Sequence, residues 1–266
     1  MRQNRSFLSK ILISLLIIIP AIGLSFGSLK DIRYKNKGTD GNRLWNLMGN
    51  GGEVRGYEVK GKLTFTFDDG PDHRTTPVLL NMLDQYRVKA AFFVNGYRFH
   101  NRTAGGDENR SVLREIYKRG HYIGNHTFSH KDITSIASSE WKHEIDLVSI
   151  QVDDIVGRKL LMFRPPFGRN SEETLKKLES ENYTIVMWNL DPLDWKARTA
   201  LELLGRVKKV IEENPDGGIL LMHDTNSVTV EAFPLIMEWL RERNRKLAAK
   251  NLPGLEIVGL DEFIKR

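Results

Sequence analysis

The sequence predicts an α/β protein built from parallel βα units, arranged either as an open sheet or as a closed barrel. From Lys62 onward, seven strand-like segments alternate with six helical patterns, which is the order of elements that parallel sheets require. Polar clusters follow directly after five of the candidate strands, and the carboxyl ends of parallel strands share one face of such folds. A chain of 266 residues with 40% apolar and 28% charged residues can bury one core of this kind.

The candidate strands are short runs of β-branched and aromatic residues bounded by turn residues. They cover residues 62–67, 90–95, 121–125, 160–164, 184–190, 217–222 and 255–259. The helical patterns between them cover residues 77–86, 109–119, 139–156, 171–181, 200–213 and 233–249. Thr76 and Pro77 form a typical helix start, because Thr is a good N-cap and Pro suits the first helical position.

Residues 1–27 have the pattern of a signal peptide or an N-terminal membrane anchor. Three basic residues precede an apolar run from Ile11 to Phe26, and this order is typical of export signals. The run is shorter than the ~20 residues that a spanning helix usually needs, so cleavage and membrane attachment through residues 8–27 both stay open. We therefore expect an exported protein that is extracellular, periplasmic or held at the cell surface.

The excess of basic residues lies at the N-terminus, outside the predicted domain. The chain has a formal net charge of +6, but residues 1–37 contain seven Lys and Arg residues and one acidic residue. The remaining chain has 33 basic and 33 acidic residues and gives no electrostatic reason to expect a nucleic-acid partner. Residues 28–60, rich in Gly, Asn and Lys, are interpreted as a tether and irregular lead-in to a domain at 61–266.

The first candidate strand ends in two adjacent carboxylates, Asp68 and Asp69, before a turn at Gly70 and Pro71. Asp is a common turn residue because its side chain bonds nearby backbone N–H groups, so a structural role is one explanation. Two neighbouring carboxylates repel each other, however, unless a cation relieves the repulsion. One of them could ligate a metal while the other takes a proton from a bound water, whose pKa the metal lowers to ~7.

His126 and His130 are four residues apart, a spacing that predicts two imidazoles on one turn of a helix. Together with a carboxylate from the first strand, they would form a three-ligand metal site with a position left for water. The alternative is a helix start whose histidines make only local hydrogen bonds.

Three further polar residues follow strands and could serve proton transfer. His223 ends an apolar strand and could protonate a leaving group near neutral pH, with Asp194 to orient it; a solvated, idle histidine is the alternative. Arg164 could hold the free Asp, because guanidinium groups pair well with carboxylates, although a surface ion pair would also explain it. Phe167 and Trp195 lie in polar loops after strands, where aromatic residues often line a sugar-binding groove.

Five motifs in order resemble those of the polysaccharide deacetylases, the NodB-homology domain of carbohydrate esterase family 4. They are Thr66-Phe-Asp-Asp-Gly70, His126-x-x-x-His130, Arg164-x-Pro166-Phe-Gly168, Asp191-x-x-Asp-Trp195 and Leu221-x-His223. The resemblance covers about residues 60 to 262. It implies a distorted (β/α) barrel with about seven parallel strands, and removal of N-acetyl groups from an N-acetylated glycan with release of acetate.

The resemblance also implies a role for each motif residue. Asp68 would be the general base, oriented by Arg164, and His223 the general acid, tuned by Asp194. A divalent metal, usually Zn²⁺ with Co²⁺, Ni²⁺ or Mn²⁺ as alternatives, would be held by Asp69, His126 and His130. The remaining residues would contact the substrate: the Phe167 N–H as an oxyanion donor, and an apolar slot for the acetyl group formed by Pro166, Trp195 and Leu221.

Three other functions remain open from the sequence. Two histidines and one carboxylate also describe non-haem iron oxygenases, although those enzymes need neither a free Asp nor a distant acid. A non-catalytic glycan-binding domain of the same fold, and a related amidase acting on a small amide, are the other two. Among glycans, peptidoglycan, a chitin-like oligomer and an exopolysaccharide all fit.

Overall fold

The structure is a computed structural model, and it describes residues 52–264. The predicted signal or anchor at 1–27, with its apolar stretch 8–27, lies outside the described residues, as does most of the predicted tether at 28–60. Within the described part of the chain, no helix is long and apolar enough to cross a membrane.

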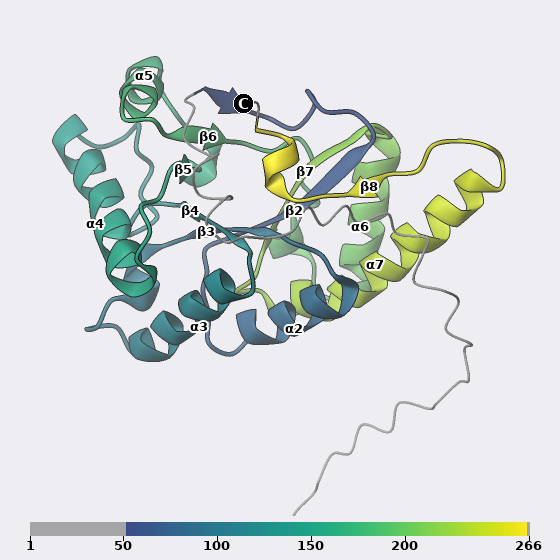
Figure 1. The fold of residues 1–266 in the computed structure, drawn as a ribbon, viewed down its shortest axis with the longest axis horizontal. Coiled ribbons are helices and arrows are strands. Elements are labelled where there is room, and N and C mark those ends of the chain that lie inside the picture. Colours follow the sequence, from purple (N-terminus) through teal and green to yellow (C-terminus); the bar gives the residue numbers. More distant parts are fainter. Residues whose placement is uncertain (1–51, 265–266) are drawn as a thin grey trace, which may run out of the picture. The chain divides into compact units, whose positions relative to one another are not determined.

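The described residues form an eight-stranded sheet in which every pair of strands is parallel, so the predicted α/β class is confirmed (Figure 1). Its strands are β1 (Glu53–Val54), β2 (Lys62–Asp68), β3 (Ala91–Val94), β4 (Tyr122–Asn125), β5 (Met162–Phe163), β6 (Thr184–Val186), β7 (Gly217–His223) and β8 (Glu256–Ile257). The order is β1-β6-β5-β4-β3-β2-β7, and β8 pairs with β2. All seven predicted strands are present, and β1 is an additional strand inside the segment that was predicted to be irregular.

The sheet closes on itself through the chain that follows β6, which makes it the predicted distorted barrel. Leu190 forms an isolated parallel bridge with Leu220 of β7. The side chain of Asn189 adds two hydrogen bonds to β7. Its Nδ2 donates to the Gly217 carbonyl oxygen at 3.0 Å, and its Oδ1 accepts from the Ile219 N–H at 2.8 Å. This closure requires glycine at residue 218, because a Cβ there would lie 2.0 Å from the Asn189 amide.

The longest pairing in the sheet, between β2 and β7, brings two candidate site residues side by side. It runs in register from Lys62 opposite Gly217 to Asp68 opposite His223. Both strands therefore end at the same face of the barrel, and each ends in a titratable side chain.

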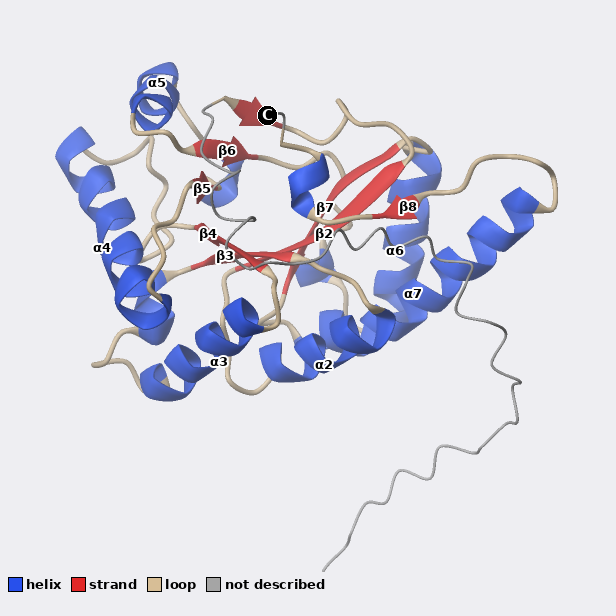
Figure 2. Cartoon of the chain, viewed as in Figure 1, coloured by secondary structure: helices blue, strands red, loops and turns tan. Residues whose placement is uncertain are grey.

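Among the described residues, six α-helices cover the outside of the curved sheet, as predicted (Figure 2). They are α2 (Thr76–Tyr86), α3 (Gly106–Lys118), α4 (Ser138–Val156), α5 (Glu172–Ser180), α6 (Ala200–Glu213) and α7 (Ser227–Ala248). Helix α7 begins earlier than predicted, because the Asn226 side chain caps it by accepting a hydrogen bond from the Val228 N–H, and Pro234 lies inside the helix.

Thr76 does not have the predicted capping role at the start of α2. The cap residue is Thr75, and its side chain makes no capping hydrogen bond. The Thr76 hydroxyl instead accepts a hydrogen bond from the Asp72 N–H at 2.9 Å and donates one to the buried carboxylate of Asp224. This hydroxyl therefore fastens the turn after β2 rather than the helix.

The alternation along β2 separates an apolar face from a polar one. Leu63, Phe65 and Phe67 are fully buried and belong to the core between the sheet and the helices. The rings of Phe65 and Phe233 of α7 lie 5.3 Å apart in an edge-to-face contact. The intervening residues point to the inside of the barrel, so the strand delivers Asp68 to the interior at its carboxyl end.

We expect Phe65→Ala to lower the free energy of unfolding by about 3–5 kcal/mol, because it removes a fully buried ring and leaves a cavity. Leu201→Ala is the control, since Leu201 is 71% exposed and should change stability by no more than about 0.5 kcal/mol. Urea unfolding monitored by circular dichroism measures both, and equal effects would contradict this assignment of the core.

Candidate active site

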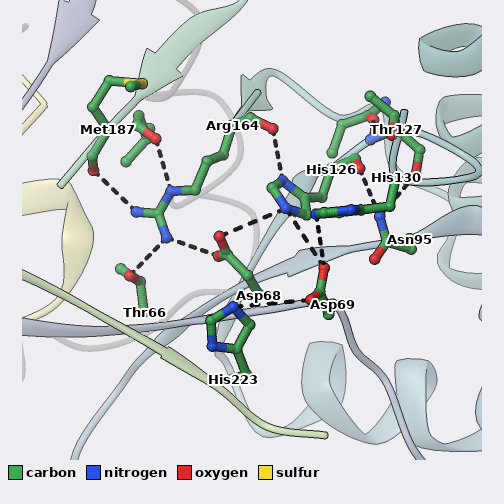
Figure 3. Close-up of polar contacts among 12 residues, drawn as sticks. Thr66, Asp68, Asp69, Asn95, His126, Thr127, His130, Arg164, Met187 and His223 are labelled. Atoms are coloured by element: carbon green, nitrogen blue, oxygen red, sulfur yellow. Dashed lines mark hydrogen bonds and ion pairs between the residues drawn. The ribbon is translucent and has the colours of Figure 1, made fainter. Parts of the chain in front are cut away.

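The carboxyl ends of β2 and β4 bring Asp69, His126 and His130 together (Figure 3). Asp69 Oδ1 lies 3.6 Å from His126 Nε2 and 3.4 Å from His130 Nε2. One ligand atom from each of these three residues, which together are called the cluster below, lies within 4.8 Å of the others. Asp69 Oδ1 is buried and has no hydrogen-bond partner among the described residues. Two imidazoles and a carboxylate oxygen in need of a partner fit a divalent cation such as Zn²⁺.

The two histidines converge, but not on a helix, so that part of the prediction is wrong. Residues 126–130 form a loop between β4 and α4. Thr127 and His130 have left-handed backbone conformations, with φ of 66° and 58°, and these turn the chain back on itself. The imidazole ring centroids lie 5.0 Å apart as a result. A spacing of four residues suits either a helical turn or this loop, and the sequence does not distinguish them.

Burial and one hydrogen bond determine the charge and the tautomer of the His126 imidazole. Its Nδ1 lies 2.7 Å from the carbonyl oxygen of Arg164, which can only accept, so Nδ1 carries the proton and Nε2 the lone pair. Burial lowers the pKa of His126 to about 3, although the charge of Asp69 works in the opposite direction. The imidazole is therefore neutral near pH 7, with its free lone pair at Nε2, as a metal ligand requires.

Arg164 is fully buried and holds Asp68 at the end of β2. Its Nη1 donates hydrogen bonds to Asp68 Oδ1 and to the Thr66 hydroxyl, both at 2.8 Å. Its Nε and Nη2 donate to the carbonyl oxygens of Val186 and Met187 at 2.8 and 3.0 Å. The surface ion pair that the sequence left open is thereby excluded. Charge-assisted bonds in such a setting fix the orientation of the carboxylate.

The environment of Asp68 favours proton acceptance. Burial raises the pKa of this carboxyl, and the charge of Arg164 opposes that effect without cancelling it. Asp68 Oδ1 is bonded to Arg164, whereas Oδ2 faces the cluster and lies 3.7 Å from His126 Nε2. A carboxylate with a raised pKa is a better general base than an ordinary aspartate.

His223 and Asp194 form the predicted pair on the other side of Asp69. Asp194 is buried, and its Oδ1 lies 2.7 Å from His223 Nδ1. Asp194 Oδ2 accepts hydrogen bonds from the His223 N–H at 2.7 Å and the Thr229 hydroxyl at 2.6 Å. His223 Nε2 lies 3.9 Å from Asp69 Oδ2. Burial alone would lower the pKa of His223, but the hydrogen bond and charge of Asp194 outweigh it and raise that pKa to about 9.

The predicted substrate-contacting residues differ in exposure. Phe167 and Trp195 are each 61% exposed, whereas Pro166 and Leu221 are buried. The Phe167 ring also makes an edge contact with His130, at 4.6 Å between centroids. An exposed aromatic ring beside His130, such as that of Phe167, suits contact with the apolar face of a sugar ring.

A cavity of about 410 Å³ opens beside the cluster and contains residues that the sequence analysis missed. Its lining consists of Asp69, Asn95, Tyr97, Ser129 and His130. Asn95 follows β3 in the way that the predicted site residues follow their strands, and this position was the available signal. Nothing in the local sequence indicated that Glu144 of α4 would accept hydrogen bonds from the Ser129 N–H and hydroxyl, at 2.6 and 2.7 Å.

Fold and site together define a (β/α)-barrel protein with a candidate metal-binding site of two histidines and one aspartate. The family model described as polysaccharide deacetylase matches residues 56–186. The chain is 33% identical over 194 residues to a peptidoglycan-N-acetylglucosamine deacetylase from Bacillus cereus, and the match covers 68% of this chain and 82% of that protein. The chain therefore belongs to the polysaccharide deacetylase family.

Two other comparisons show the extent of the likeness. A second peptidoglycan-N-acetylglucosamine deacetylase from Bacillus cereus is 32% identical over 166 residues, which are 62% of this chain and 57% of that protein. The match thus spans little more than half the length of this relative. The crystal structure of a CE4 family pseudoenzyme from Bacillus anthracis has a TM-score of 0.67 and 24% identity, and covers 80% of this chain and 69% of that one. At this identity, the likeness shows the shared fold.

We expect the His223 imidazole to titrate near pH 9, and to titrate well below that in Asp194→Asn, because the Asp194 carboxylate is the main stabiliser of the imidazolium. NMR titration of the metal-free protein measures both values. Because the pKa of His223 is higher in the folded than in the unfolded protein, its protonation stabilises the fold. This stabilisation is complete below the ordinary pKa of 6.5 and is lost as the pH rises through about 9. Between pH 6.5 and about 9, the free energy of unfolding of the wild type should therefore fall by on the order of 2–3 kcal/mol. Over the same pH range, the free energy of unfolding of Asp194→Asn should fall less. Equal slopes would contradict the pairing.

Proposed function

We propose that this protein is a metal-dependent deacetylase that removes N-acetyl groups from an N-acetylated amino-sugar polysaccharide and releases acetate. The observation that carries the proposal is the arrangement of a base and an acid about one candidate metal site. Asp68 Oδ2 lies 3.7 Å from His126 Nε2, and His223 Nε2 lies 3.9 Å from Asp69 Oδ2. Amide hydrolysis needs a group to take a proton from water and another to give a proton to the amine.

The metal would be held by Asp69, His126 and His130. Nitrogen and oxygen ligands in a set of three suit Zn²⁺, and Co²⁺, Ni²⁺ or Mn²⁺ are the alternatives. When bound, a divalent cation would polarise the acetamide carbonyl and lower the pKa of a coordinated water.

The protein's own residues would move the protons. Asp68 would accept a proton from the attacking water at Oδ2, since Oδ1 is already bonded to Arg164. His223 would donate from Nε2 to the amine nitrogen as the C–N bond breaks, because its Nδ1 is bonded to Asp194. The water oxygen stays on the acyl carbon, so the products are acetate and a free amino sugar.

The loop after β5 would stabilise the negative charge that develops on the carbonyl oxygen. None of the described residues accepts a hydrogen bond from the Phe167 N–H. Its left-handed φ of 60° is an uncommon conformation for a residue with a side chain, and such conformations concentrate at functional sites. A backbone N–H with no partner is a suitable oxyanion donor.

Peptidoglycan is the first substrate to test, with chitin-like oligomers and exopolysaccharides as alternatives. The two relatives named above are peptidoglycan-N-acetylglucosamine deacetylases. Leu221, Pro166 and Trp195 would surround the acetyl methyl group, and the exposed rings of Phe167 and Trp195 would contact the sugar. A cell-wall substrate also agrees with the export pattern of residues 1–27, which would bring the domain outside the cytoplasm as a free or anchored protein.

Asp68→Asn should lower acetate release by at least about 100-fold, because the base is lost while the metal ligands remain. Its metal content, measured by plasma mass spectrometry, should stay close to that of the wild type. His126→Ala should lose both metal and activity. An Asp68→Asn protein that is folded and keeps most of its turnover would show that the base is assigned wrongly.

The proposed activity requires acetate release from at least one glycan in a panel of peptidoglycan, chitin oligomers and exopolysaccharide. A chelator should abolish the release, and added Zn²⁺, Co²⁺, Ni²⁺ or Mn²⁺ should restore it. Acetate from small amides alone would favour the amidase alternative. Glycan binding without acetate release, in protein with metal bound, would favour a binding domain of the same fold.

A further inference from the structure

Asn95 connects the two loops that carry the candidate metal ligands. Its backbone N–H donates a hydrogen bond to the carbonyl oxygen of Gly70, the residue after Asp69, at 3.1 Å. Its side-chain Nδ2 donates to the carbonyl oxygens of His126 and Thr127, at 2.6 and 3.3 Å (Figure 3). Asn95 is only 1% exposed, so these bonds are protected from competition with water.

Both loops need such support, because they contain residues in an unfavourable backbone conformation. Asp69 has a φ of 71° and Thr127 a φ of 66°, which place residues with side chains in the left-handed region. Residues hold this conformation only when surrounding contacts over-determine it. The Asn95 amide bonds directly to the carbonyl groups of the two peptides that flank Thr127, the residue in the left-handed conformation.

The chain after Asn95 continues this contact. The N–H groups of Gly96 and Tyr97 donate to the carbonyl oxygens of Thr127 and Phe128, at 3.2 and 2.9 Å. A Cβ at residue 96 would lie 2.6 Å from the Phe128 ring, so the close approach of the two segments depends on glycine there. The backbone bonds alone would hold the segments together, and the Asn95 amide specifies the orientation of the His126 end.

We propose that Asn95 is a positioning residue for the metal site: its backbone N–H holds the loop of Asp69, and its amide orients the loop that carries His126 toward it. The inference rests on the proposed function, because it assumes that these two residues bind the same cation. His130 has independent support through the bonds of Ser129 to Glu144. Loss of the amide should therefore weaken metal binding without abolishing it, since one imidazole and the carboxylate keep their own supports.

The test is the affinity of the metal-free protein for Zn²⁺, measured by competition with a chromophoric chelator at fixed pH. Asn95→Ala and Asn95→Leu, which differ in volume but both lack the amide, should each bind Zn²⁺ about 10- to 100-fold more weakly than the wild type. The matched control is Asn189→Ala. This variant also removes an amide that bridges two segments with two hydrogen bonds. The Asn189 amide, however, lies where the chain after β6 closes the barrel against β7, away from the cluster.

Thermal melting of the same metal-free proteins separates positioning from general destabilisation. Asn189→Ala should lower the melting temperature and leave the Zn²⁺ dissociation constant within about twofold of the wild type, because its amide has no ligand to orient. Wild-type affinity in the Asn95 variants, or equal weakening in Asn189→Ala, would overturn the positioning role alone. A wild-type protein that binds none of the four metals would overturn the proposed function, and this inference with it.

Discussion

A buried guanidinium connects β2 to the end of β6 across the interior of the barrel, at the face that carries the candidate active site. Burying a charge is costly unless it is paired and hydrogen-bonded, and Arg164 meets both conditions. Its donors reach Asp68 and Thr66 on β2 and two carbonyl groups at the end of β6. The Phe93 ring lies 4.1 Å from the guanidinium carbon and adds a cation–π contact.

Arg164 acts on the site through its main chain as well as its side chain. The guanidinium orients Asp68, and the carbonyl oxygen accepts the Nδ1 proton of His126. One residue thus orients the candidate base through its side chain and specifies the tautomer of a candidate ligand through its main chain. The environments of Asp68 and His223 complement this arrangement: burial raises the pKa of the first, and Asp194 keeps the second protonated. Groups whose environments are tuned in this way are suited to acid–base chemistry.

The sequence predicted the fold and the convergence of the site well, because both follow from order along the chain. Strands that alternate with helices pair in parallel, and residues just after those strands must then meet at one face. Strand β1 was missed since two residues carry no periodicity, and its pairing with β6 is non-local. The loop conformation at His126–His130 was also missed, because a spacing of four residues does not reveal the left-handed angles at Thr127 or its contact with Asn95. The N-terminal segment remains a prediction.

The register between β2 and β7 has a consequence for how the protein is made. Asp68 and His223 lie opposite each other in that pairing, although most of the domain separates them along the chain. An N-terminal fragment that ends before residue 223 lacks His223, so a nascent polypeptide cannot pair Asp68 with this residue until β7 has been translated. Contacts between such distant segments generally form slowly. The two side chains therefore come together only after the synthesis of β7, the strand against which the barrel also closes.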